Sequence, residues 1–179
     1  MRDPIIHDVG LRDGLQVEQA VVPTEQKLAW LRTLAGAGVD MIQVGSFVHP
    51  TKVPQMADTD RLFTILNEPG DRPPGVVLSG LVLNEKGLER GLACGVDYFC
   101  MGVSASDTHS RKNTGMSTLE AADRIIAIAK DARAAGKGVQ VSVQSAFGCG
   151  YEGAIPQERV LDLVRRFLDT GLRTISLAD

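Results

Sequence analysis

The chain has 179 residues, of which 44% are hydrophobic, and this is enough for one domain with its own core. A net charge of −3 and an aromatic content of 4% argue against a nucleic-acid-binding protein, which needs a basic field or stacking rings. Three cysteines without a CxxC spacing argue against a disulfide framework or a structural zinc site. Because no apolar run is long enough to cross a membrane, we expect a cytoplasmic protein without a membrane partner.

Short apolar runs alternate with helical patterns along the chain. The runs are rich in β-branched residues, as is typical of buried parallel strands, and cover residues 5–9, 39–44, 76–82, 96–103, 139–143 and 174–177. Apolar side chains at helical spacing predict intervening helices that begin near Thr24, Leu62, Asn84, Ser117 and Pro156. Strict alternation of strand and helix predicts a parallel α/β fold.

The ends of these helices carry recognisable signals. Ser117 and Glu120 have the spacing of a capping box. Gly38, Gly95 and Gly171 each lie between a helix and the following strand, where a left-handed glycine stops the helix. The repetition of this junction supports a series of similar helix–strand units.

Two architectures fit this alternation, a doubly wound sheet and a barrel. No GxGxxG or phosphate-binding loop follows the first strand, which weakens the case for a nucleotide-binding sheet. Polar residues instead gather directly after the strands, where a barrel builds its active site, at Arg12-Asp13, Ser46, Ser104 and Asp179. We therefore predict a (β/α)₈ TIM barrel.

Arg12 and Asp13 together have the chemistry of an enolate-forming site. An aspartate carboxylate is a hard oxygen ligand suited to Mg²⁺ or Mn²⁺. The adjacent guanidinium can donate two hydrogen bonds to a substrate oxygen that becomes an enolate. By themselves, however, these two residues fit a solvated ion pair in an ordinary loop at least as well.

Longer motifs strengthen the functional interpretation. The segment RDGLQ at 12–16 resembles the signature after the first strand of metal-dependent lyases and synthases that share this barrel. The segments SFVHP at 46–50 and VPQMAD at 53–58 resemble the second-strand loop of the 3-hydroxy-3-methylglutaryl-CoA lyases. FGCGYEG at 147–153 is similar to the fifth-strand loop of that family, and SLAD at 176–179 resembles the end of its sixth strand.

The resemblance implies a reaction and a set of roles. A 3-hydroxy-3-methylglutaryl-CoA or similar 3-hydroxyacyl-CoA would be cleaved in a retro-Claisen-type reaction to acetyl-CoA and a keto acid. Asp13 would ligate Mg²⁺ or Mn²⁺, Arg12 would bind the carbonyl and hold the enolate, and Asp8 and Asp179 would belong to the proton-transfer network. The implied substrate-binding residues are Arg12, Gln16, Gln43, Ser46, His109 and Ser176. We also expect the protein to form a homo-oligomer.

The sequence departs from the family pattern at three points. Gln43 stands where these lyases usually carry Glu, and Asp8 is one methylene shorter than the usual Glu. The paired metal-binding histidines of the family follow strand seven, its catalytic Cys lies on a later loop, and the chain ends before both. We therefore expect residues 1–179 to be the N-terminal portion of a single TIM-barrel catalytic domain, truncated after the sixth strand and incomplete alone.

Two other functions stay open on this evidence. A synthase or aldolase of the same superfamily would condense acetyl-CoA with a 2-oxo acid, and a non-catalytic partial barrel would bind only a ligand or a partner chain. The segment 46–58 favours the lyase, whereas Gln43 leaves the substrate undecided.

Overall fold

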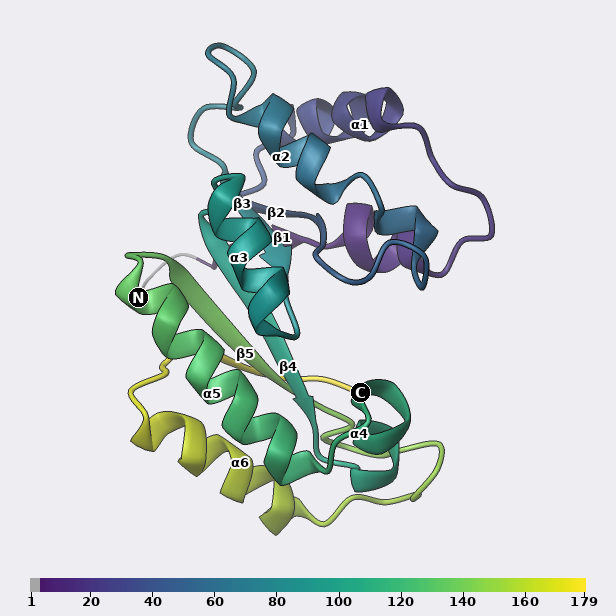
Figure 1. The fold of residues 1–179 in the computed structure, drawn as a ribbon, viewed down its shortest axis with the longest axis vertical. Coiled ribbons are helices and arrows are strands. Elements are labelled where there is room, and N and C mark those ends of the chain that lie inside the picture. Colours follow the sequence, from purple (N-terminus) through teal and green to yellow (C-terminus); the bar gives the residue numbers. More distant parts are fainter. Residues whose placement is uncertain (1–3) are drawn as a thin grey trace. The chain divides into compact units, whose positions relative to one another are not determined.

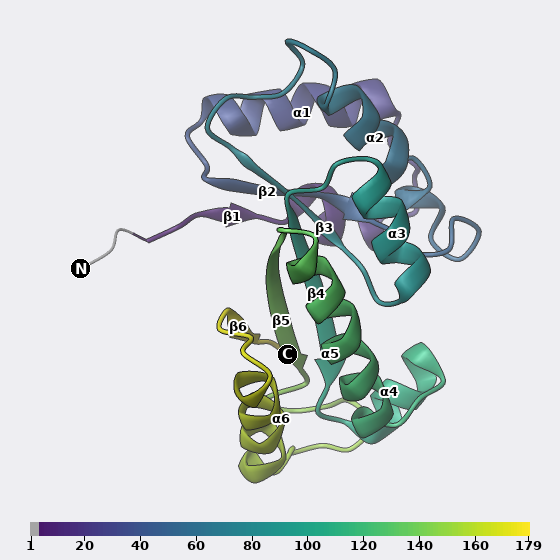
Figure 2. The same cartoon turned by 60° about the vertical axis from the view of Figure 1, so that its left-hand side comes forward.

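The structure is a computed structural model that describes residues 4–179. The chain forms two compact units, Met1–Phe99 and Cys100–Asp179 (Figures 1 and 2). The elements that begin in the first unit are β1 (His7–Asp8), η1 (Gly10–Gly14), α1 (Thr24–Gly36), β2 (Met41–Ser46), η2 (Pro54–Met56), α2 (Thr59–Leu66), β3 (Val77–Leu81), α3 (Glu85–Ala93) and β4 (Tyr98–Ser104). The second unit continues with α4 (Asp107–Thr114), α5 (Thr118–Ala134), β5 (Gly138–Gln144), α6 (Gln157–Asp169) and β6 (Ile175–Leu177).

The strands are ordered β1-β2-β3-β4-β5-β6, as they are along the chain. The pairs β1–β2, β2–β3 and β5–β6 are parallel, with Met41 opposite His7 and Ser176 opposite Ser142. Parallel neighbours require a crossover connection, and the helices between the strands provide it. The α/β alternation predicted from the sequence is thereby confirmed. Among the described residues, no helix combines the length and apolarity that a membrane span requires.

Each unit buries apolar side chains between its strands and its helices. In the first unit, Leu31 and Phe63 from helices and Ile42 and Leu78 from strands are fully buried. In the second unit, α5 and α6 lie side by side along β5 (Figures 1 and 2) and bury Ile128 and Phe167. Leu168, which the helical pattern places inward, is 37% exposed, while Leu163 is buried.

The local signals for helix ends are confirmed. The Ser117 hydroxyl accepts a hydrogen bond from the Glu120 amide, and the Glu120 carboxylate accepts one from the Ser117 amide at 2.8 Å, which makes a complete capping box. Gly38, Gly95 and Gly171 have φ angles of 88°, 79° and 83°, which are left-handed, as their position between helix and strand requires.

Two elements differ from the expectation. The first strand has only two residues, and Ile5 and Ile6 are 71% and 58% exposed, because only one neighbouring strand, β2, pairs with β1 within the described residues. Helix α4 was not predicted, because its sequence DTHSRKNT has no apolar stripe. It begins at the side chain of Ser106, which accepts from the His109 amide at 3.1 Å, and it ends at the left-handed Gly115.

A buried ion pair joins α1 to the segment before α2. The Lys27 ammonium is buried, and it donates to the Asp58 carboxylate and to the Gln55 carbonyl, both at 2.6 Å. The Thr24 hydroxyl donates to the second oxygen of Asp58 at 2.9 Å. Part of the 53–58 motif therefore has a structural task, which is to hold this segment against α1.

Candidate active site

The chain makes a tight turn directly after β1. In η1, the Leu15 amide donates to the Gly10 carbonyl five residues earlier, which is the hydrogen-bond spacing of a π-helix. Leu11 is buried and anchors the turn, while the Asp8 carboxylate accepts from the Gly10 amide at 3.0 Å. The turn leaves Arg12 and Asp13 as consecutive polar residues immediately after the first strand, as the sequence predicted.

Arg12 is the centre of a three-residue cluster. Its Nε donates to Oε1 of Gln43 at 2.5 Å, and its Nη1 donates to Oδ1 of Asp13 at 2.6 Å. The Arg12 side chain is 18% exposed, whereas that of Asp13 is 64% exposed. The guanidinium is thus held from two sides, and the carboxylate faces solvent.

Gln43 is positioned by an irregularity in β2. The register between β2 and β3 shifts between Gln43 and Gly45, and such bulges often change the direction of a side chain near a functional site. Gly45 packs so closely on α2 that a Cβ at this position would overlap the Thr59 hydroxyl oxygen. That hydroxyl accepts from the Ser46 amide at 3.2 Å and donates to the Met56 carbonyl at 2.8 Å, which fixes the end of β2.

The Ser46 hydroxyl is buried and has no partner in the part of the chain that the structure describes. Ser46 ends β2 and is fully buried, and within residues 4–179 its Oγ has no hydrogen-bond partner. An unsatisfied buried hydroxyl costs free energy, which a ligand oxygen or a water molecule can recover. This observation agrees with a substrate-binding role for Ser46.

Two other predicted residues, Asp8 and Gln16, flank the turn that carries Arg12 and Asp13, and the unpredicted His7 precedes them. Asp8 borders a hollow of about 340 Å³ that is lined mainly by apolar residues of η1 and α1, including Leu11 and Trp30. Gln16 is half-buried in the helical turn that follows η1. His7 is half-buried, and its Nε2 lies 2.9 Å from the Ser79 hydroxyl; burial lowers the pKa of this imidazole.

In the second unit, His109 lies in the first turn of α4. Its ring stacks on that of Tyr151 with centroids 6.3 Å apart, and its Nδ1 is buried without a partner in the described part of the chain. Ser176 is a half-buried residue of β6, and Asp179 is exposed in the segment after it. The structure therefore brings Arg12, Asp13 and Gln43 into contact, and it places His109, Ser176 and Asp179 in the other unit.

Sequence reasoning missed the most connected acidic residue of the second unit. Glu152 accepts hydrogen bonds from Thr108, Ser106 and Arg159, and the Thr108 amide is the first cause that lowers the pKa of Glu152 to about 2. The sequence signal was its place in the glycine-rich motif 147–153, although nothing in that motif identifies its partners.

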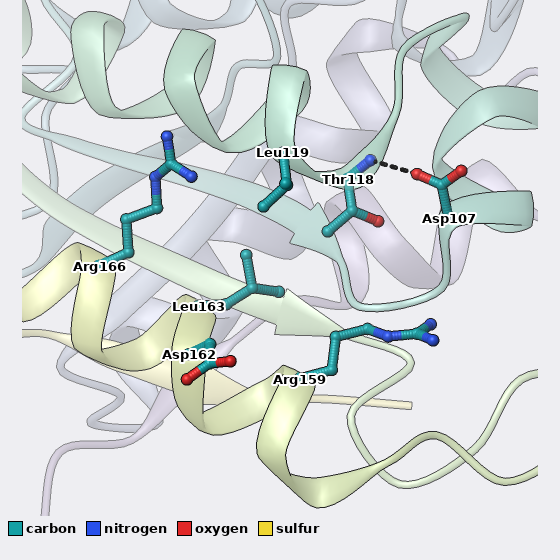
Figure 3. A pocket seen from close by; sticks show the side chains of 7 residues that line it. All are labelled: Asp107, Thr118, Leu119, Arg159, Asp162, Leu163 and Arg166. Atoms are coloured by element: carbon teal, nitrogen blue, oxygen red, sulfur yellow. Dashed lines mark hydrogen bonds between the residues drawn. The ribbon is translucent and has the colours of Figure 1, made fainter.

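A separate pocket of about 290 Å³ lies between the start of α5 and α6 (Figure 3). Its lining residues are Asp107, Thr118, Leu119, Arg159, Asp162, Leu163 and Arg166. Figure 3 shows Leu119 and Leu163 facing each other while Asp107 accepts from the Thr118 amide at 2.8 Å. None of the predicted site residues lines this pocket.

Comparison with known proteins settles the family. The model of the family described as HMGL-like matches residues 3–179. This chain belongs to the HMGL-like family. It is 36% identical to a hydroxymethylglutaryl-CoA lyase of Bacillus subtilis over 97% of the chain and 57% of the relative. The mitochondrial lyase of Rattus norvegicus is 38% identical over 97% of the chain and 52% of the relative.

Solved HMG-CoA lyase structures confirm the fold prediction. The crystal structure of the Bacillus subtilis lyase matches with a TM-score of 0.92 at 36% identity, over 98% of this chain and 57% of that one. A lyase of Acinetobacter baumannii in complex with coenzyme A and 3-methylmalate matches with a TM-score of 0.88 at 31% identity, over 98% and 56%. The chain thus has the fold of part of the HMG-CoA lyase TIM barrel, and it spans a little over half the length of these relatives.

The position of Gln43 against Arg12 leads to a prediction about metal affinity. Gln43→Glu adds a carboxylate beside the Arg12–Asp13 pair, so we expect divalent cations to bind more tightly, by about tenfold or less. Calorimetric titration with Mn²⁺ measures this change. Gln26→Glu on α1 is the control for one added charge, and equal or weaker binding by Gln43→Glu would show that Gln43 does not face a metal.

Proposed function

We propose that this protein is a carbon–carbon lyase that cleaves 3-hydroxy-3-methylglutaryl-CoA or a similar 3-hydroxyacyl-CoA to acetyl-CoA and a keto acid. The observation that carries the proposal is the Arg12 guanidinium, held by Gln43 and Asp13 after β1. Family membership and the coenzyme A bound to the Acinetobacter baumannii relative support it.

The reaction is a retro-Claisen-type cleavage. A base removes the proton of the tertiary hydroxyl, a carbonyl forms, and the bond to the thioester α-carbon breaks. The electron pair passes to the enolate of acetyl-CoA, whose α-carbon then takes up a proton. Donors that are already oriented stabilise such a developing charge without reorganisation, and this is the role that we give to Arg12.

The other candidates take the remaining roles in this proposal. Asp8 and Asp179 are the proton-transfer groups; Asp8 is half-buried and Asp179 is exposed. Ser46 is a substrate-binding residue, supported by its buried hydroxyl that lacks a partner within the described chain. Gln16, His109 and Ser176 complete the substrate-binding set.

A divalent cation fits Asp13 as one ligand. The exposed carboxylate is a hard oxygen donor of the type that Mg²⁺ and Mn²⁺ prefer, and the family is generally metal-dependent. Across residues 4–179, no three His, Cys, Asp or Glu residues are grouped closely enough to hold a metal. Asp13 would therefore share the ion with substrate, water or groups outside this set, and a bound cation would polarise the substrate oxygens.

A coupled assay on the complete purified protein tests the proposal. With 3-hydroxy-3-methylglutaryl-CoA and Mg²⁺, we expect equal amounts of acetyl-CoA and acetoacetate, with turnover lost on chelation and restored by Mg²⁺ or Mn²⁺. Condensation of acetyl-CoA with a 2-oxo acid, without cleavage, would identify the synthase instead. Ligand binding with neither reaction would identify a non-catalytic protein.

Replacing the proposed metal ligand gives a second test. Asp13→Asn removes the negative charge and keeps the size, so the Mg²⁺ concentration for half-maximal turnover should rise by at least about tenfold. Asp71→Asn removes an exposed carboxylate that pairs with Arg32 and is the matched control. Unchanged Mg²⁺ dependence in Asp13→Asn would rule out Asp13 as a ligand.

A further inference from the structure

Glu152 connects the loop after β5 with the segment after β4. Its Oε1 accepts from the Thr108 amide at 2.7 Å and from the Ser106 hydroxyl at 2.9 Å. Its Oε2 accepts from Nη1 of Arg159 at 2.8 Å, and the same nitrogen donates to the Ala105 carbonyl at 3.1 Å. One carboxylate thus contacts the segment 106–108 at the start of α4 and the guanidinium of Arg159 on α6.

The ionised form of Glu152 is the one that these contacts require. The Thr108 amide, then Arg159 and the Ser106 hydroxyl, lower its pKa to about 2. At neutral pH the Glu152 carboxylate is therefore ionised and accepts hydrogen bonds at the first turn of α4, where a helix favours negative charge. A neutral side chain of the same shape loses the ion pair with Arg159 and weakens the bond to Thr108.

Ser106 transmits this anchoring to His109. The Ser106 hydroxyl donates to Glu152 and accepts from the His109 amide at 3.1 Å. The Cys149 thiol also donates to this hydroxyl, at 3.0 Å, and Cys149 is itself held by two backbone hydrogen bonds with Gly153. Ser106 is fully buried, so its hydroxyl has a single well-defined environment.

The His109 ring is held against Tyr151, and one of its nitrogens has no partner among the described residues. This ring lies at 21° to that of Tyr151, which comes from the same loop as Glu152. The Lys112 ammonium lies 4.3 Å from the centroid of the Tyr151 ring. Nδ1 of His109 is buried, and no group of residues 4–179 satisfies it. A buried nitrogen of this kind is satisfied when a ligand oxygen reaches it.

From these contacts we infer that Glu152 is a positioning residue, which holds the start of α4 on the loop after β5 so that His109 contacts the substrate. The inference rests on the proposed lyase function, because it deepens the role given there to His109. Glu152 itself acts only through Ser106 and Thr108. A shift of about 1 Å in a substrate-contacting group can lower activity by about 100-fold, so removal of the anchor has a measurable effect.

A double-substitution experiment on the complete protein distinguishes positioning from general stability. Glu152→Gln and His109→Ala are each expected to lower kcat/KM for the 3-hydroxyacyl-CoA by about 10- to 100-fold. Because Glu152 acts through His109, the double variant should lose no more kcat/KM than the single variant with the larger loss. Glu158→Gln, which affects an exposed ion pair with Arg165, is the matched control and should change nothing.

Amide hydrogen exchange gives a readout that does not depend on turnover. Glu152→Gln should exchange the Thr108 and His109 amides faster than the wild type, while amides outside α4 and the loop after β5 keep their exchange rates. Multiplicative losses in the double variant, or unchanged protection of these two amides, would overturn the inference. If the wild-type protein shows no lyase activity, the proposed function fails, and the exchange rates alone then support or overturn positioning by Glu152.

Discussion

Substitution of Arg12 by lysine should lower kcat by about 10³-fold, with a much smaller change in KM. Arg12 uses Nε for Gln43 and Nη1 for Asp13, so its planar group is oriented before the substrate arrives. Lysine keeps the charge but has one nitrogen on a flexible stem, and it cannot reproduce both contacts together with a bond to the enolate. Steady-state kinetics with the acyl-CoA substrate measure the effect.

The control for this substitution is Arg61→Lys, which changes an exposed arginine paired with Glu25. It should leave both kinetic constants as they are. If Arg12→Lys raised KM and left kcat unchanged, Arg12 would bind the substrate without stabilising the transition state.

Loss of Lys27 should produce the largest change in stability. Among residues 4–179, Lys27→Ala leaves the Asp58 carboxylate with the Thr24 hydroxyl as its side-chain donor. Removal of one partner of a buried ion pair typically costs about 3–5 kcal/mol. Urea unfolding followed by circular dichroism should show this decrease in the free energy of unfolding.

An exposed ion pair provides the comparison for Lys27. Arg61→Ala breaks the pair with Glu25, in which both side chains are more than half exposed, and should cost less than about 1 kcal/mol. Equal effects of the two substitutions would mean that the Lys27–Asp58 pair contributes no more than a surface contact.

The elements and their order could be predicted because their signals are local. The capping box of Ser117 and Glu120 spans four residues, and Arg12 and Asp13 are adjacent. By contrast, α4 has no apolar periodicity. It begins at Ser106, whose hydroxyl also donates to Glu152 in the loop after β5. Only its two ends, Ser106 and Gly115, carry local signals.

The contacts between residues far apart in the sequence could be identified only from the folded structure. Glu152 and Thr108 are 44 residues apart, and no local pattern pairs them. Lys27 did carry a signal, because it shares the spacing of Thr24, Leu28 and Leu31 and therefore falls on the buried face of α1. A charged residue at such a position indicates a buried partner, although only the folded chain identifies it as Asp58.

The π-type turn of η1 makes the length of the first loop as important as its composition. Neighbouring residues of a helical turn point in different directions, so deletion of Gly10 or Leu11 would rotate Arg12 and Asp13 together away from their present position at Gln43. Conservative replacements there keep the backbone path, whereas a single-codon deletion changes it. Insertions and deletions should therefore be far rarer in this segment of homologous genes than in the connector 68–75, whose length fixes no functional side chain.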